Sequence, residues 1–225
     1  MIRLCIFDLD GTLSNTLDSL YYYCNAALRR CGFPPVEDKD AVRYMVGRGI
    51  SALLRDLIRS SLGDSFTEEQ LALLQETYES LYSTDPMHLV TEYDGVRSML
   101  HALQEDGVML AVFSNKPDAM TKEVVRSLYP EISFSICLGK CDAFPRKPAP
   151  DGALWIMEQL GVEKAETLYI GDSETDMETG RNAGLQTVGV TWGFRSAEEL
   201  RQSGGRQIVD APAEILAIVH NTNDL

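Results

Sequence analysis

Two aspartates two residues apart, Asp8 and Asp10, directly follow a short apolar segment near the start of the chain. The apolar residues 4–7 predict a buried strand that ends at the first of these carboxylates. Because side chains alternate between the two faces of an extended chain, Asp8 and Asp10 can point in the same direction, and Gly11 then permits a tight turn. Two carboxylates at the tip of a buried strand are costly unless a metal ion or a shared proton neutralises them, so this segment predicts a site of chemistry.

Polar residues also follow two later apolar segments. Ser114 and Asn115 come after the run 108–113, and Asp172 comes after the run 167–170. Ligands of open α/β sheets bind beyond the carboxyl ends of the strands, so these side chains are expected beside the paired aspartates. A hydroxyl and backbone N–H groups at a strand tip can hold phosphate oxygens, whereas carboxylate oxygens suit Mg²⁺. The plainer alternative for each of these residues is the capping of a turn or a helix.

Lys147 lies in the segment Lys147-Pro148-Ala149-Pro150, directly before a predicted helix over residues 150–160. A lysine brought to the paired aspartates could offset the charge of a nucleophile and hold a transferred phosphoryl group. Lys140 is a rival for this role, and the plainer alternative for either residue is a solvated surface lysine.

Hydrophobic periodicity predicts that residues 15–86 are all-helical. The expected helices are 16–30, 37–46, 50–62 and 67 to about 82. Thr67 and Gln70 fit a capping box at the start of the last of them.

From Tyr93 onward, apolar strands alternate with helices. The strands are expected at 108–113, 132–138, 167–170, 186–190 and 208–209. This alternation predicts a parallel sheet with helices on both faces. The fold class is therefore α/β, with a core of residues 1–14 and 87–225 that is interrupted after its first strand by the helical insertion, residues 15–86.

The composition excludes several classes of function. The chain has 225 residues, 44% of them hydrophobic and 24% charged, and a formal net charge of −14. Such a chain has no broad attraction to nucleic acid or to an anionic membrane, so neither is expected as a partner. The five cysteines are odd in number and lack metal-ligand spacing, which is typical of reduced thiols. With no signal peptide and no membrane-length apolar segment, a cytoplasmic protein is expected.

The polar segments resemble, in chain order, the four motifs of the haloacid dehalogenase superfamily in its phosphatase form. The four are Asp8-Leu9-Asp10-Gly11-Thr12-Leu13, Val112-Phe113-Ser114-Asn115-Lys116, Lys147-Pro148-Ala149-Pro150 and Ile170-Gly171-Asp172-Ser173-Glu174-Thr175-Asp176. The resemblance covers nearly the whole chain outside the insertion. It implies a three-layer, Rossmann-like core in which the insertion is a helical cap domain. It also favours Lys147, because Lys140 does not match the Lys-Pro-x-Pro pattern.

The resemblance implies a phosphomonoester hydrolase that depends on Mg²⁺ and forms an aspartyl-phosphate. In such an enzyme Asp8 is the nucleophile and Asp10 is the general acid and base. Ser114, Asn115 and Lys147 would bind the phosphoryl group. Mg²⁺ and Lys147 would lower the pKa of Asp8, while the neighbouring charge would raise that of Asp10.

The resemblance also implies the ligands of the metal. They would be Asp8, the backbone carbonyl of Asp10 and Asp172, while Asp176 would brace the site through hydrogen bonds. Capping of the helix near Thr175 is the plainer alternative for Asp172 and Asp176.

One segment of the insertion bears on the substrate. Val46-Gly47-Arg48-Gly49-Ile50 resembles the cap loop of phosphoglycolate phosphatases, and residues 191–194 resemble that group too. Arg48 could bind a carboxylate on the leaving group; the alternative is a turn with a solvated arginine. The expected partner is a small phosphorylated metabolite, with 2-phosphoglycolate as a candidate, bound by a monomer or homodimer.

Four functions other than a phosphomonoester hydrolase are alternatives; three fit the residues less well, and one, a mutase, fits the core residues equally well. A haloacid dehalogenase needs no metal and usually lacks an acid at position 10, and a phosphonate hydrolase would need a cap lysine, for which only Lys39 is present. A phosphosugar mutase shares every core residue and stays open as the alternative enzyme. A non-catalytic phospholigand sensor is a further alternative, which retention of both Asp8 and Asp10 disfavours.

Overall fold

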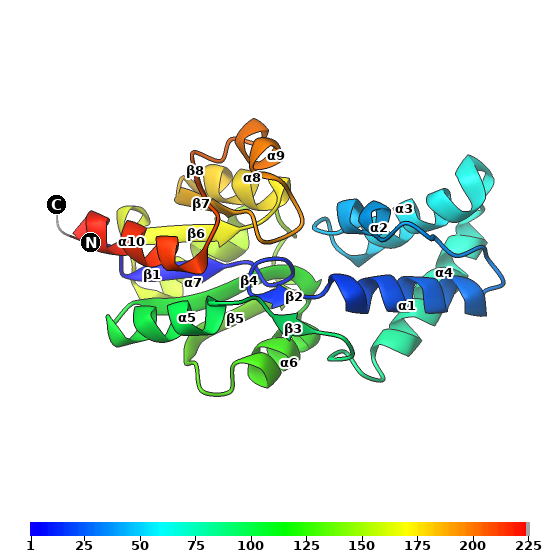
Figure 1. Cartoon of the computed structure of the whole chain (residues 1–225), viewed down its shortest axis with the longest axis horizontal. Helices are drawn as coiled ribbons and strands as arrows, with labels where there is room; N and C mark the ends of the chain where they lie inside the picture. The colour runs from blue at the N-terminus through cyan, green and yellow to red at the C-terminus, as the bar shows by residue number, and fades with distance from the viewer. Residues whose placement is uncertain (224–225) are drawn as a thin grey trace. The chain divides into compact units, whose positions relative to one another are not determined.

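The structure is a computed structural model that describes residues 1–223, and the chain divides into two compact units. The first contains residues 1–15 and the chain from residue 91 onward; the second is Thr16–Val90. Figure 1 shows that the first unit is built of strands and helices and the second of helices. The sequence placed the insertion at 15–86, whereas the contacts within the structure place the second unit at 16–90.

A six-stranded parallel sheet forms the centre of the first unit, in the order β5-β4-β1-β6-β7-β8. Its strands are β1 (Leu4–Phe7), β4 (Met109–Pro117), β5 (Phe134–Lys140), β6 (Thr167–Gly171), β7 (Gln186–Val190) and β8 (Gln207–Val209). The four residues of β1 are all fully buried, as expected for a central apolar strand. Phe7 lies opposite Val112 of β4 and Ile170 of β6, so the residues that follow these three strands meet at one edge of the sheet.

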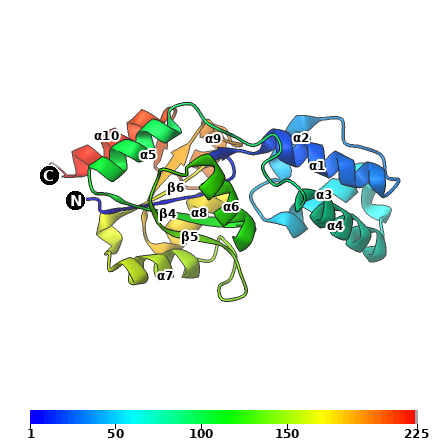
Figure 2. The same ribbon diagram turned by 90° about the horizontal axis from the view of Figure 1, so that it is seen from below.

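Helices cover both faces of this sheet. They are α5 (Val96–Glu105), α6 (Asp118–Leu128), α7 (Asp151–Leu160), α8 (Glu174–Ala183), α9 (Ala197–Gln202) and α10 (Pro212–Asn223). α5 and α10 lie side by side on one face, and α7 and α8 pack together on the other (Figure 1 and Figure 2). Between α7 and the sheet, apolar side chains such as Phe113 of β4, Ile156 of α7 and Tyr169 of β6 form a buried cluster. The predicted three-layer α/β fold is confirmed.

The helical unit contains α1 (Leu17–Arg30), α2 (Lys39–Met45), α3 (Ile50–Leu62), a 3₁₀ turn (Gly63–Ser65) and α4 (Glu68–Tyr82). The capping box of Thr67 and Gln70 is confirmed at the start of α4. Tyr23 of α1 is buried and lies edge-on against the ring of Tyr82 from α4. These two tyrosines therefore serve the packing of the unit.

Two features of the first unit differ from the predicted strands. β4 was expected to end at Phe113 but runs to Pro117, because β5 continues beside it to Lys140. The short strands β2 (Ser14–Asn15) and β3 (Thr91–Glu92), which were not predicted, pair antiparallel at the two points where the chain leaves and re-enters this unit.

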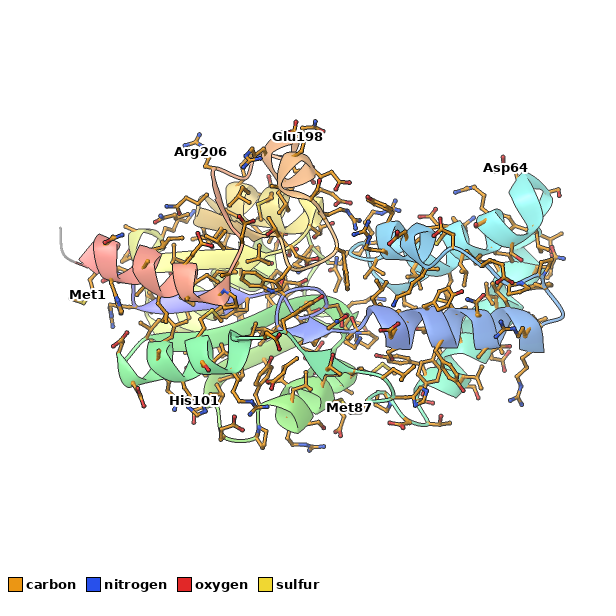
Figure 3. All side chains as sticks on the ribbon, viewed as in Figure 1. Met1, Asp64, Met87, His101, Glu198 and Arg206 are labelled. Carbon is orange, nitrogen blue, oxygen red and sulfur yellow. The ribbon has the colours of Figure 1, made fainter. Side chains whose placement is uncertain are left out.

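Polar side chains cover the outer surfaces of the helices (Figure 3). His101, which Figure 3 labels, projects from α5, where its Nε2 lies 3.5 Å from a carboxylate oxygen of Glu131. Within residues 1–223, no helix combines the length and the hydropathy that spanning a membrane requires.

Candidate active site

The loop after β1 is fixed from two sides. The chain turns at Gly11, whose φ of 92° suits glycine. The indole Nε1 of Trp192 donates to the Thr12 carbonyl at 3.0 Å, and the hydroxyl of Tyr129 donates to the Leu13 carbonyl at 2.6 Å. Two residues far away in the sequence thus hold the loop that follows the predicted nucleophile, and neither contact uses the carbonyl of Asp10.

Lys147 is the cation that the structure brings to Asp8. Its Nζ lies 2.7 Å from Asp8 Oδ1 and 2.8 Å from Asp176 Oδ1, and its side chain is only 2% exposed. Asn115 fixes the backbone of Lys147, since its Oδ1 accepts the Lys147 N–H at 2.9 Å and its Nδ2 donates to the Lys147 carbonyl at 3.2 Å. Lys140, the rival lysine, is exposed at the end of β5.

Asp172 is buried between the first loop and the loop after β7. Its Oδ2 accepts the Phe194 N–H at 2.7 Å, and its Oδ1 accepts the Thr12 hydroxyl at 3.3 Å. A Cβ at residue 193 would overlap both the Gly11 carbonyl oxygen and the Asp172 carboxylate, so the close approach of the two loops requires glycine there.

Asp176 combines the two roles that the sequence left open for it. Ser173 and Asp176 form a capping box at the start of α8, in which the Ser173 N–H and hydroxyl both donate to Asp176 Oδ2, at 3.1 and 2.5 Å. Its other oxygen, Oδ1, faces Lys147 and accepts the Tyr169 hydroxyl at 3.4 Å. One carboxylate therefore starts the helix and orients the buried lysine.

Asp8, Asp172 and Asp176 form a group with the chemistry of a metal site. One carboxylate oxygen from each lies within 4.8 Å of the other two, and all three residues are buried. When ionised, the negative charges of these three carboxylates exceed the one positive charge in direct contact with them within residues 1–223, that of Lys147, while Arg195 acts on Asp172 from farther away. A divalent cation would balance this excess, and a donor set made only of oxygen fits Mg²⁺. The predicted ligands Asp8 and Asp172 are both members of this group.

The uncompensated charge is reflected in the pKa values. The pKa of Asp8 is raised to about 7, because burial and the charge of Asp176 raise it by more than Lys147 lowers it. Burial, with the charges of Asp176 and Asp8, also places the pKa of Asp172 well above its usual range. Lys147 does lower the pKa of Asp8, as expected, but burial and the charge of Asp176 outweigh it, and the further lowering expected from Mg²⁺ stays a prediction. Lys147 stays charged, because burial lowers its pKa but the carboxylates of Asp176 and Asp8 outweigh that effect.

Asp10 contacts a lysine to which the sequence assigned no role. Lys116 Nζ lies 3.1 Å from both carboxylate oxygens of Asp10, and the Lys116 side chain is 5% exposed. Ser114 is buried, and its hydroxyl accepts the Lys116 N–H at 3.2 Å. Lys116 was detectable as the neighbour of Ser114 and Asn115 in the second motif. Tyr129 was not, because it lies in none of the motifs.

Arg48 belongs to the helical unit, in the segment between α2 and α3. Its Nη2 lies 2.5 Å from Asp56 Oδ2, and about half of its side chain is exposed. The structure therefore gives Arg48 an ion pair within its own unit, and contact of Arg48 with a substrate stays a prediction. Phosphate binding by Ser114 and Asn115 also stays a prediction.

The motifs, the fold and this site match a known family. A family model described as haloacid dehalogenase-like hydrolase covers residues 5–190 of the chain. The chain therefore belongs to the haloacid dehalogenase-like hydrolase family, and the predicted family is confirmed.

Within this family the chain is similar to the phosphoglycolate phosphatases. It is 32% identical to the phosphoglycolate phosphatase of Vibrio vulnificus over 221 residues, which is 97% of this chain and 96% of that protein. A crystal structure from Haemophilus somnus, named a predicted phosphoglycolate phosphatase, superposes with a TM-score of 0.89 at 28% identity, covering 96% of this chain and 97% of that one. The prediction of an enzyme of the phosphatase kind is confirmed at this level.

The fold extends to other members of the superfamily. A protein of Thermotoga maritima, provisionally assigned as a β-phosphoglucomutase, superposes with a TM-score of 0.73 at 24% identity, covering 98% of this chain and 99% of that one. This likeness shows the shared fold alone, so it does not favour the mutase alternative.

Proposed function

We propose that this phosphatase hydrolyses 2-phosphoglycolate, or a closely similar small phosphomonoester, with Mg²⁺ and through an aspartyl-phosphate on Asp8. The observation that carries the proposal is the position of Asp8, with its Oδ1 2.7 Å from Lys147 Nζ inside a buried group of three carboxylates. Phosphomonoesters hydrolyse so slowly without a catalyst that charge stabilisation of this kind is needed on several sides of the phosphoryl group.

In the first step a carboxylate oxygen of Asp8 attacks phosphorus. A bond forms between that oxygen and phosphorus while the bond from phosphorus to the leaving oxygen breaks, and Asp10 gives a proton to the leaving oxygen. In the second step a water molecule attacks the same phosphorus, Asp10 takes its proton, and the bond to Asp8 breaks to release phosphate. Lys147 and Ser114 hold the phosphoryl oxygens in both steps.

Asp8, Asp172 and the backbone carbonyl of Asp10 would hold Mg²⁺, and Asp176 would keep Lys147 and the first turn of α8 in place. When it is bound, the ion supplies positive charge to the phosphoryl oxygens and to the nucleophile. The excess of carboxylates over the ammonium of Lys147 in this buried group supports the assignment.

The substrate assignment has two supports. The relative from Vibrio vulnificus reported above, at 32% identity, is named a phosphoglycolate phosphatase. The half-exposed guanidinium of Arg48 suits recognition of a carboxylate, which 2-phosphoglycolate carries on its leaving group. The helical unit would then act as a cap that excludes water and contacts this leaving group.

The test is a comparison of kcat/KM for 2-phosphoglycolate, a neutral alkyl phosphate and a phosphorylated hexose, each with and without Mg²⁺. We expect 2-phosphoglycolate to be preferred and activity to require the ion. Asp8→Asn should lose activity by about 10³-fold or more while its far-UV circular dichroism is unchanged. The matched control is Asp142→Asn, which makes the same change at an exposed position and should keep full activity.

Two outcomes would contradict the proposal. Full activity in Asp8→Asn would remove the nucleophile assignment. Conversion of a sugar phosphate to its isomer without release of phosphate would instead identify a mutase, and ³¹P NMR of the products distinguishes the two reactions.

A further inference from the structure

We propose that Lys116 is a positioning residue that orients the carboxylate of Asp10 for proton transfer to the leaving group. The proposal rests on the function proposed above, in which Asp10 is the general acid. Its basis is the contact of one ammonium with both oxygens of one carboxylate, at 3.1 Å each, with the lysine side chain 5% and the aspartate side chain 16% exposed.

Asp10 needs such a partner more than the other aspartates of the site. Asp8, Asp172 and Asp176 are each held by contacts from elsewhere in the site. Within residues 1–223, Lys116 is the residue whose side chain lies within hydrogen-bond distance of the Asp10 carboxylate. Because both oxygens are engaged, the contact fixes the direction of the carboxylate, which otherwise could rotate at the tip of the loop.

Lys116 is itself anchored, so it can hold another group in place. It lies in β4, and its carbonyl accepts the hydroxyl of Thr121 from α6 at 3.1 Å. A Cβ at Gly139 of β5 would lie 2.7 Å from the same carbonyl, which shows how closely the neighbouring strand packs against it. The strand that carries Ser114 therefore also carries the residue that sets the direction of the general acid, and both are positioned together.

The chemistry of the leaving group makes this role measurable. An alkoxide needs a proton as it leaves, whereas p-nitrophenolate leaves as a stable anion and needs little help. Because hydrolysis of the aspartyl-phosphate uses Asp10 as a base with either substrate, the comparison is made in kcat/KM, which reports the steps up to release of the leaving group. On this measure a residue that acts through Asp10 must matter for alkyl phosphates and matter little for p-nitrophenyl phosphate. A lysine that binds the phosphoryl group would matter for both substrates, because both present the same group.

The experiment measures kcat and KM of Lys116→Met for 2-phosphoglycolate and p-nitrophenyl phosphate, with Mg²⁺ saturating. We expect kcat/KM on 2-phosphoglycolate to fall about 100-fold, mostly through kcat, with kcat/KM on p-nitrophenyl phosphate falling less than about threefold. Lys122→Met is the matched control, because Lys122 is an exposed lysine of α6 whose Nζ lies 2.6 Å from Asp118 Oδ2. This control should leave kcat/KM unchanged for both substrates. Lys116→Arg should restore part of the loss, since it keeps a cation within reach of Asp10.

A second measurement tests whether Lys116 acts through Asp10. In the Asp10→Asn background, Lys116→Met should cost less than about threefold further on 2-phosphoglycolate, because the group it orients is gone. Equal losses on the two substrates, a rise in KM alone, or full additivity with Asp10→Asn would overturn the proposal. If Lys116→Met lowers the thermal midpoint strongly, Lys116→Arg decides, and an equal loss on both substrates in that folded variant also overturns it.

The failure of this inference can be told from the failure of the proposed function. A wild-type protein that releases phosphate from neither substrate would refute the proposed function. A wild-type protein that hydrolyses both, with variants that lose activity on both alike, would refute only the role of Lys116.

Discussion

Binding of Mg²⁺ should become weaker as the pH falls, because the ion must displace protons from buried carboxylates. In the metal-free protein, with Lys147 beside Asp8, burial is the main reason that the pKa of Asp8 is raised to about 7. Asp172, whose pKa burial and neighbouring carboxylates also raise, changes the affinity in the same direction. Since a carboxylate binds a metal in its ionised form, each of these groups competes for the ion through its proton.

The size of the effect follows from the pKa of Asp8. With a pKa of about 7, this group is about nine-tenths ionised at pH 8 and about one-tenth ionised at pH 6. The affinity for Mg²⁺ should therefore fall about tenfold between these two pH values, which corresponds to ~1.4 kcal/mol. Any proton that Asp172 releases over the same range makes the fall steeper. Asp8 alone should therefore release about half a proton per bound ion at pH 7 and about nine-tenths of a proton at pH 6.

The stability of the metal-free protein should show the opposite trend. The pKa of Asp8 is higher in the folded state than its value of 3.8 in an unfolded chain, so the folded state binds the extra proton between these values. Stability without Mg²⁺ therefore decreases as the pH rises from about 4 through 7. Added Mg²⁺ should reverse this trend, because it stabilises the ionised form that burial penalises.

Isothermal titration calorimetry with Mg²⁺ checks both statements. Titrations at pH 6, 7 and 8 give the affinities, and buffers with different ionisation enthalpies give the number of protons released. Asp8→Asn is the informative variant, because it should bind the ion more weakly and release about one proton fewer. An affinity that is constant from pH 6 to pH 8, with no proton released, would refute the argument that Lys147 leaves this acidic group only partly compensated.

Three further substitutions test the same site and the helical unit. Lys147→Met leaves the carboxylate of Asp8 buried beside other acids, so without Mg²⁺ the free energy of unfolding in urea should fall by about 3–5 kcal/mol. An unchanged urea midpoint would contradict the buried ion pair. Gly193→Ala places a Cβ against the Gly11 carbonyl and should cost about 1–3 kcal/mol in the same assay, together with weaker Mg²⁺ binding. Arg48→Ala should lower kcat/KM for 2-phosphoglycolate about tenfold more than for a neutral alkyl phosphate, and equal losses would remove the specificity argument.

The fold was predictable because its determinants are local. The apolar runs and the helical spacing identify the central strand, the alternating strands and helices, and the helices of the insertion, and α3 begins and ends at the predicted residues. The polar residues at the strand ends could then be brought together by topology alone, since parallel strands end at the same edge. This reasoning needs no knowledge of side-chain contacts, which is why it succeeds for Asp8 and Asp172.

The contacts that orient these residues were not predictable in the same way. Tyr129 reaches the Leu13 carbonyl across 116 residues of sequence, and no periodicity links the two positions. Lys116 stands in a recognised motif, but its contact with Asp10 depends on β4 running past its apolar segment to Pro117. That extension depends on pairing with β5, which is a tertiary effect that local propensity does not contain.

The pKa of Asp8 connects catalysis to the metal. Lys147 is as close as a counterion can be, at 2.7 Å, and the pKa of Asp8 is still raised, because the lysine is shared with Asp176 and burial penalises every charge in the group. A lysine between two carboxylates neutralises one of them. In the proposed mechanism, bound Mg²⁺ would therefore contribute in two ways. It would stabilise the phosphoryl oxygens, and it would keep the carboxylate of Asp8 ionised near neutral pH. Activity should then depend on Mg²⁺ most steeply below pH 7, where Asp8 is otherwise protonated and cannot attack phosphorus.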